Sequence, residues 1–220
     1  MPETPPRRSP IHDLLEARGA EFRVVGGVAL AVRFPTAENH ADVPKSVGLC
    51  DQSGLPKLGL KGRDAESWLA NQRVDVPAAI YDSRPLPDGG VIVRFGTDEF
   101  FLEGGVGGEF VPALAAELES RSGHLYDIHR EEAAFVLLGS RVGEVLSQTC
   151  ALDFRALPPR RVVFTRVAGV SCGIFPDSAD NVPSYRIWVD YASAPYLWET
   201  LVEIVESLGG SVVPSPRGRV

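Results

Sequence analysis

The chain of 220 residues contains 22 basic and 29 acidic residues, which give it a formal net charge of −7. No segment concentrates Lys or Arg enough to neutralise phosphates, so nucleic acid is not an expected partner. No apolar run reaches the roughly 18 residues of a membrane span, and the N-terminus lacks the apolar region of a secretory signal. The three cysteines form no CxxC pair, which favours reduced thiols in a cytoplasmic protein over a disulfide framework or a zinc site.

The first elements follow a proline-rich start. Residues 1–10 contain four prolines and predict a disordered leader, and residues 214–220 predict a similar tail. The next segment, IHDLLEARGA, predicts a short helix with Ser9 available as its cap. The runs EFRVV and VALAVRF are separated by Gly26-Gly27, which is the local pattern of a β-hairpin.

A pattern that begins near Val47 recurs in the second half of the chain. In the first copy the alternating run LPKLGLKG ends at Gly62, and in the second the apolar run AAFVLLG ends at Gly139. Leu69 and Leu146 each lie seven residues beyond their glycine. Strand-like runs and an amphipathic helix follow both copies. The recurrence predicts an internally duplicated α+β protein with one unit at 11–123 and a second at 124–213.

The helix that closes each copy carries an apolar stripe. In FVPALAAELE the stripe is Val111, Leu114 and Leu118. In the last helix, APYLWETLVEIVES, we expect one face to be formed by four residues: Leu197, Leu201, Ile204 and Leu208. The hairpin VIVRF–GTD–EFFL is predicted in the first copy, and a short closing strand is predicted at SVV.

Residue types alone indicate no catalytic apparatus. None of the four histidines lies in a nucleophile turn, and surface positions are expected for them. No metal-ligand spacing or phosphate-binding glycine loop is present. The aspartates that recur in the two copies suit capping of turns and helix starts better than acid–base chemistry; they are Asp51, Asp75, Asp127 and Asp153.

Three stretches resemble a known family. They are IHDLLEARGAEFRVVGGVALAVRF, then ENHADVPKSVGLCDQS leading into LGLKGRDAESWL, and then DGGVIVRFGTDEFFL. Together they resemble the folate-dependent aminomethyltransferases typified by the T-protein of the glycine cleavage system. The second half, with GSRVGEVLSQTCALDF and YRIWVDY, is most similar to the gamma subunit of heterotetrameric sarcosine oxidase.

The resemblance implies two interlocked strand-helix-strand-strand-helix units around an opening that holds tetrahydrofolate in family members. It also implies that this chain lacks the C-terminal β-barrel domain of catalytic members. Family members present a pair of aspartates just before the strand matching VIVRF, where this chain has Gly89 and Gly90. Glycine cannot transfer or stabilise a proton, so the T-protein reaction is in question. The residues that the resemblance suggests as folate contacts are Asp88, Arg94, Tyr185 and Arg186.

Two functions follow from the resemblance. The first is a non-catalytic subunit or accessory protein that packs against a larger flavin-containing amine dehydrogenase in one-carbon metabolism. The second is a stand-alone tetrahydrofolate-binding, aminomethyltransferase-like protein in which Asp88 replaces the missing acid. No tightly bound cofactor is expected in either, and the amine or one-carbon donor stays open. A scaffold that has lost both ligand and partner is the third reading.

Overall fold

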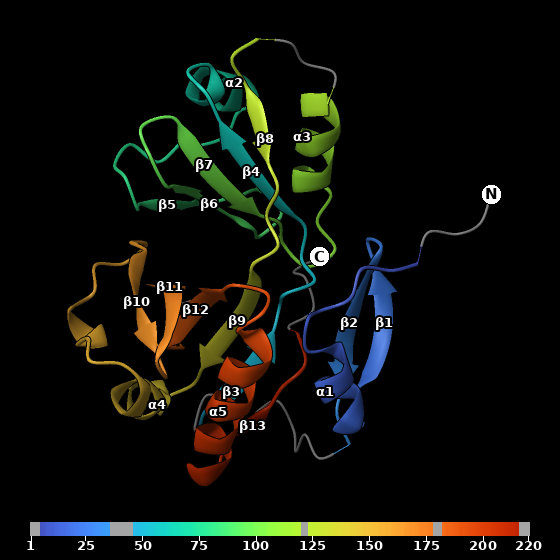
Figure 1. Ribbon diagram of the computed structural model, residues 1–220, viewed down its shortest axis with the longest axis vertical. Coiled ribbons are helices and arrows are strands. Elements are labelled where there is room, and N and C mark those ends of the chain that lie inside the picture. The colour runs from blue at the N-terminus through green and yellow to red at the C-terminus, as the bar shows by residue number, and fades with distance from the viewer. Residues whose placement is uncertain (1–4, 36–45, 120–122, 178–181, 216–220) are drawn as a thin grey trace. The chain divides into compact units, whose positions relative to one another are not determined.

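The computed structural model describes residues 5–35, 46–119, 123–177 and 182–215. It is a mixed α+β protein with sheets of two, five and six strands (Figure 1), as the sequence predicted. The described chain divides into two compact units. Unit 1 comprises the residues up to Gly54, Glu132–Pro159 and Val163–Ser215, and unit 2 comprises Leu55–Glu131 and Arg160–Val162.

The N-terminal part of unit 1 contains helix α1 (His12–Ala17) and the hairpin of β1 (Glu21–Val25) and β2 (Val28–Arg33). The predicted two-glycine turn is confirmed, because Gly26 and Gly27 have φ angles of 56° and 76°, a conformation that favours glycine. Residues 5–10 of the predicted disordered leader have defined contacts: Arg7 pairs with β2, donating its N–H to the Gly27 carbonyl (2.9 Å).

The six-stranded sheet of unit 1 has the order β10-β11-β12-β9-β3-β13. All its neighbours are antiparallel except β13, which lies parallel to β3. The predicted closing strand is therefore present as β13. The strands span β3 (Gly48–Asp51), β9 (Ala133–Leu138), β10 (Val163–Val167), β11 (Val170–Pro176), β12 (Ser184–Val189) and β13 (Ser211–Val212).

Helices α4 (Val142–Thr149) and α5 (Ala194–Ser207) cover one face of this sheet, and the short 3₁₀ helix η2 (Phe154–Ala156) lies between α4 and β10 in the chain. The buried stripe of α5 is rotated from the predicted one. Leu197 and Leu201 are buried as expected, but Ile204 and Leu208 are only partly buried. Their places in the core are taken by Trp198, Val202 and Val205, because the bulky indole is better shielded between helix and sheet. Within the described residues no helix is long and apolar enough to cross a membrane.

Unit 2 is built on a five-stranded antiparallel sheet with the order β5-β6-β7-β4-β8. Helices α2 (Ala65–Asn71) and α3 (Phe110–Glu119) bury their apolar stripes in its core, with Leu69 fully buried and the predicted stripe of α3 confirmed. The predicted hairpin at VIVRF and EFFL is also confirmed. The strands span β4 (Lys57–Lys61), β5 (Ser83–Pro85), β6 (Val91–Arg94), β7 (Glu99–Glu103) and β8 (Tyr126–Ile128).

The two larger sheets share an order of strands. In unit 2, β5, β6, β7 and β4 follow one another across the sheet, as β10, β11, β12 and β9 do in unit 1. The next strand in each sheet comes from the other predicted unit: β8, within 124–213, pairs with β4, and β3, within 11–123, pairs with β9. The predicted consecutive boundaries, 11–123 and 124–213, therefore do not coincide with the units. Residues 214 and 215 of the predicted tail continue beyond β13, with Ser215 N–H bonded to the Ala31 carbonyl at 3.2 Å.

Gly62, which ends β4, should tolerate no side chain. Its φ is 134°, and an added Cβ would collide with the His124 carbonyl oxygen. We expect Gly62→Ala to lower the free energy of unfolding by about 3 kcal/mol, from backbone strain and overpacking together. The matched control is Gly169→Ala, which has φ 82° but open space around it and should cost about 1 kcal/mol. Urea unfolding followed by circular dichroism measures both; equal losses would contradict the role of the His124 contact.

Candidate functional site

The four residues suggested by the resemblance fall into two pairs. Asp88 and Arg94 belong to unit 2, and Tyr185 and Arg186 belong to unit 1. The members of each pair do not point to a common site. Asp88 lies in the turn before β6, whereas Arg94 lies at the end of that strand. Tyr185 and Arg186 are neighbours on β12, so their side chains leave opposite faces of the sheet.

Asp88 is part of a compact glycine-rich turn. Its Oδ1 accepts a hydrogen bond from the Gly90 N–H at 3.1 Å. Its Oδ2 is buried and has no hydrogen-bond partner among the described residues. The carboxylate packs so closely on Gly108, just before α3, that a side chain at that position would collide with it. Asp88 therefore holds the turn against the start of α3 and directs its carboxylate into the protein.

Arg94 is buried, with 6% of its surface exposed, and its three guanidinium nitrogens are all bound within unit 2. Nε donates to the Pro77 carbonyl at 2.7 Å and Nη1 to the Thr97 carbonyl at 2.9 Å. Nη2 forms an ion pair with Glu66 at 2.7 Å, and the guanidinium lies over the Phe100 ring. This arrangement gives each guanidinium nitrogen a partner and joins two loops and α2 to β6, so its contribution is structural.

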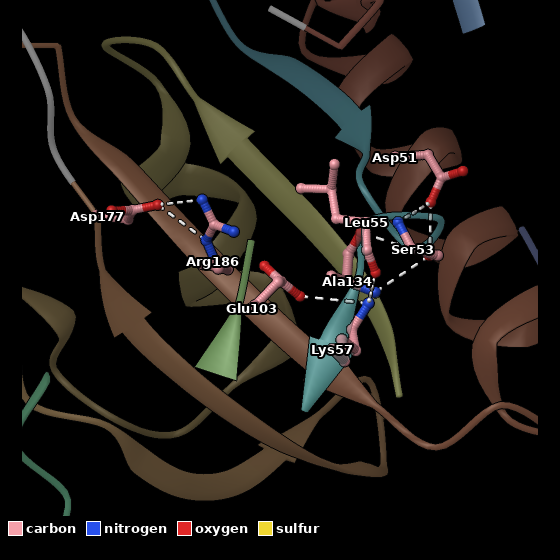
Figure 2. Close-up of polar contacts among 8 residues, drawn as sticks. All are labelled: Asp51, Ser53, Leu55, Lys57, Glu103, Ala134, Asp177 and Arg186. Carbon is pink, nitrogen blue, oxygen red and sulfur yellow. Dashed lines mark hydrogen bonds and ion pairs between the residues drawn. The ribbon is translucent and has the colours of Figure 1, made fainter. Parts of the chain in front are cut away.

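A buried ion pair lies on the neighbouring strands of unit 2. Lys57 and Glu103 stand directly opposite each other on β4 and β7, and both side chains have 0% exposure. Lys57 Nζ is 3.4 Å from a Glu103 carboxylate oxygen and donates to the Leu55 carbonyl at 3.3 Å, as Figure 2 shows. Removing either partner would leave an uncompensated charge in the interior, which costs far more than an exposed pair contributes.

Asp51 has the turn-capping role that the sequence predicted. One of its carboxylate oxygens accepts from the Ser53 N–H at 3.0 Å and from the Ser53 hydroxyl at 2.5 Å. Ser53 Oγ in turn accepts from the Ala134 N–H at 3.1 Å (Figure 2). These bonds continue the pairing of β3 with β9 past the last residue of β3, so the carboxylate is committed to the backbone.

Tyr185 lies on the face of the unit 1 sheet that the helices cover. Its hydroxyl donates to the Phe154 carbonyl at 3.2 Å, and its ring meets the Phe154 ring edge-on. Burial, together with the nearby charge of Asp153, raises the pKa of the Tyr185 hydroxyl above its ordinary value. Tyr185 is therefore a neutral hydrogen-bond donor at physiological pH and has no access to the opposite face.

Arg186 lies on that opposite face, 7% exposed, where Nε and Nη2 both contact one Asp177 oxygen at 2.9 and 2.7 Å (Figure 2). Strand register places Trp188 and Cys50 on the same face, and Gln52, two residues past Cys50, continues the ladder just beyond β3 by donating its N–H to the Ala134 carbonyl at 2.8 Å. Trp188 packs on Phe175 with ring centroids 4.9 Å apart. Gln52 is 5% exposed, and its Oε1 has no partner among the described residues. A guanidinium, an unsatisfied amide oxygen and an aromatic pair on one sheet face suit a planar heterocycle with N–H donors.

The other titratable side chains that the structure describes offer no metal site. Among the residues the structure describes, no three of the His, Cys, Asp and Glu side chains lie close enough together to hold a metal ion. His124 and His129 are exposed as expected, whereas His12 is buried against the Phe22 ring, with centroids 4.1 Å apart. His12 is buried, contrary to the prediction, because it lies on the apolar side of α1 together with Leu15. His40 lies outside the described residues.

A model of the GCVT N-terminal domain matches residues 11–213 of this chain. The chain belongs to the GCVT N-terminal domain family. It is 23% identical over 214 residues to an aminomethyltransferase of Saccharopolyspora erythraea, with 90% of this chain and 58% of that protein covered. It is 25% identical over 218 residues to an aminomethyltransferase of Rubrobacter xylanophilus, covering 90% of this chain and 56% of that protein. The chain thus spans less than two thirds of these relatives.

Two solved structures share the GCVT fold with this chain. The glycine cleavage system aminomethyltransferase T of Bartonella henselae matches with a TM-score of 0.76 at 20% identity, over 94% of this chain and 59% of that one. A chain of heterotetrameric sarcosine oxidase from Corynebacterium sp. U-96 matches with a TM-score of 0.65 at 20% identity, over 93% of this chain and 97% of that one. At these identities the likeness establishes the fold alone.

Gly89 and Gly90 occupy the positions where the resemblance led us to expect two aspartates, and the structure disfavours a side chain at both. Gly89 has φ 81° and open space, so a side chain there would be strained. Gly90 lies so close to the Glu103 carbonyl and Gly104 that no Cβ fits. The backbone of the β5–β6 turn therefore packs directly on the end of β7. Sequence reasoning noticed the glycines but missed this contact, and it also missed the Lys57–Glu103 pair, because both depend on the register between β4, β6 and β7.

The collision at Gly90 predicts that the GCVT-type carboxylate cannot be restored by substitution. We expect Gly90→Asp to lower the free energy of unfolding by about 3 kcal/mol or more, since the backbone of β7 must move. Gly89→Asp is the matched control with the same added charge, and its strain should cost only about 1 kcal/mol because Asp adopts positive φ more readily than most residues. Thermal and urea unfolding measure the difference. A Gly90→Asp protein as stable as the wild type would refute the packing argument.

Proposed function

We propose that this chain is a T-protein-like, non-catalytic subunit or accessory protein of a folate- and flavin-dependent, amine-oxidising complex of the sarcosine oxidase type. The main support for this proposal is the packing at Gly90, where an added Cβ would collide with the backbone of β7. A transferase of this family needs an acid near the reacting one-carbon group. A backbone that leaves no room for its side chain favours a role in which this chain performs no proton transfer.

The surroundings of Asp88 support the same proposal. Asp88 is the nearest carboxylate in sequence to the two glycines, and it would have to serve as the substitute acid. One oxygen is bonded to the Gly90 N–H, and the other is buried against Gly108. A general acid must come within hydrogen-bond reach of its substrate, and this carboxylate points into the turn that it stabilises.

A subunit role is supported by the kind of protein that shares the fold. The sarcosine oxidase chain that matches is part of a heterotetramer, and the match extends over 97% of it. We propose a larger flavin-containing amine dehydrogenase subunit as the partner here, with the one-carbon chemistry carried by that subunit. Soluble cytoplasmic assembly fits the reduced cysteines and acidic composition.

Purification from the native host tests the subunit proposal. We expect the tagged chain to elute with a larger chain in stoichiometric amount and with the visible absorbance of flavin, because a stable subunit contact survives affinity purification. Mass spectrometry identifies the chains, and an unrelated acidic protein with the same tag provides the control. A chain that elutes alone and colourless, or that turns over a methylated amine with tetrahydrofolate unaided, would contradict the proposal.

The second candidate is a stand-alone tetrahydrofolate-binding, aminomethyltransferase-like protein. The specific observation in its favour is the sheet face that carries Arg186 and Trp188 together with the unsatisfied amide oxygen of Gln52. A reduced pterin offers N–H donors to such an oxygen and a flat ring to the aromatic side chains. This candidate assigns binding to unit 1 and leaves the source of the catalytic acid open.

Tetrahydrofolate titration separates the two candidates. If the chain binds folate by this face, saturating tetrahydrofolate should raise the melting temperature by mass action, and Arg186→Gln should abolish the rise. Arg23→Gln is the control, because Arg23 is exposed and lies on β1, outside the six-stranded sheet. An unchanged melting temperature in the wild type, or a rise that persists in Arg186→Gln, would refute binding at this face.

We also propose that the two halves arose by internal duplication. Gly62 and Gly139 end corresponding strands and both have positive φ, at 134° and 118°. Leu69 and Leu146 occupy corresponding positions on α2 and α4 and are both fully buried. The shared strand order of the two sheets supports the same origin.

A further inference from the structure

Two of the three cysteines lie on the same side of the unit 1 sheet. Cys150 ends α4, and its Sγ is 3.5 Å from the Thr165 hydroxyl of β10. Thr165 is paired directly with Cys172 on β11, so the Thr165 and Cys172 side chains leave the same face as immediate neighbours. Both sulfur-bearing side chains therefore flank one threonine.

The backbone holds these segments together. The Ala168 N–H, in the β10–β11 turn, donates to the Thr149 carbonyl at 2.8 Å, which ties the last residue of α4 to the hairpin. The Cys150 N–H remains bonded to the Leu146 carbonyl at 2.9 Å, so the end of the helix is well defined. Cys150 lies beside Thr165, and Thr165 is the cross-strand neighbour of Cys172, so a movement of the helix end can bring the two cysteines within the Cα separation of about 4.4 to 6.8 Å that a disulfide requires.

Cys50 cannot take part. It lies on β3 with its side chain on the opposite face of the sheet, packed between Val136 and Val213. Desolvation by complete burial, with the nearby Asp51 charge, raises the pKa of the Cys50 thiol. The chain thus contains one candidate pair and one internal control.

We propose that Cys150 and Cys172 form an oxidation site that closes to an intramolecular disulfide in the presence of peroxide. All three thiols are free in the structure, which is the reduced form. The proposal does not depend on the proposed function, because it concerns the stability of unit 1 and not a ligand or partner.

The order of the two steps follows from exposure. Cys150 is only partly buried, so its thiolate attacks one oxygen of hydrogen peroxide, the O–O bond breaks, and a sulfenic acid and hydroxide form. The Cys172 thiol then attacks the sulfenic sulfur, the S–O bond breaks, and the sulfenic hydroxyl leaves with the proton of the Cys172 thiol as water. Two thiols are oxidised and one peroxide is reduced to two waters. Burial raises the pKa of the Cys172 thiol to about 12, so little of this thiol is ionised and the resolving step is the slower of the two.

Peptide mapping of the full chain tests the proposal. After treatment with hydrogen peroxide, blocking of free thiols and digestion with trypsin, we expect a cross-linked species that joins residues 142–155 to residues 167–186. Its mass should be the sum of the two peptides less two hydrogens, and dithiothreitol should separate them. The peptide that contains Cys50 should carry only the blocking group.

Variants distinguish this outcome from random oxidation. Cys50→Ser should give the same cross-link as the wild type, whereas Cys150→Ser, which retains a hydroxyl beside Thr165, should give none. Circular dichroism confirms that each variant is folded, and the wild-type map decides the question if a variant is not. A map with Cys150 oxidised to sulfinic acid and Cys172 still blocked, or with Cys50 in the cross-link, would overturn the proposal.

Discussion

The antiparallel pairing of β3 with β9 is the contact on which most of unit 1 depends. Strand β9 is hydrogen-bonded on one side to β12 and on the other to β3, which is supplied from a distant part of the chain. Asp51 and Ser53 extend the ladder at one end, and β13 joins it through β3. Without β3, β9 would become an open edge, β13 would lose the one strand it pairs with among the described residues, and the backbone groups of both would need water.

The pairing of buried cations with carboxylates is the second constraint, because it limits which cations can bind a ligand anion. Lys57 is paired with Glu103, Arg94 with Glu66 and Arg186 with Asp177. A ligand anion that sought any of these cations would have to compete with a carboxylate already in contact. Such competition costs least where the anion is partly exposed, as Glu66 is at 58% and Asp177 at 36%, and most at the fully buried Glu103. Arg94 and Arg186 are therefore better suited than Lys57 to exchange a partner.

Local patterns predicted most elements correctly and the chemistry only in part. The Gly26-Gly27 hairpin, the strand ending at Gly62 and the stripe of α3 follow from spacing and turn chemistry, which act over a few residues. The exchange of β3 and β8, the Gly90 contact and the Lys57–Glu103 pair depend on register between segments far apart in sequence, which no local pattern encodes. The contacts of Arg94 with the Pro77 carbonyl and with Glu66 on α2 were not predicted for the same reason, because both partners lie in other parts of the chain.

The exchanged strands also set the order in which the chain can fold during synthesis. Strand β3 is made early, yet its antiparallel partner β9 emerges more than eighty residues later, and its parallel partner β13 and the bonds of Val213 and Ser215 come at residues 211–215. Loop closure over such separations is slow, and an unpaired apolar strand invites association with other chains. The backbone hydrogen-bonding groups of β3, residues 48–51, therefore lack these partner strands until the second half of the chain has been synthesised.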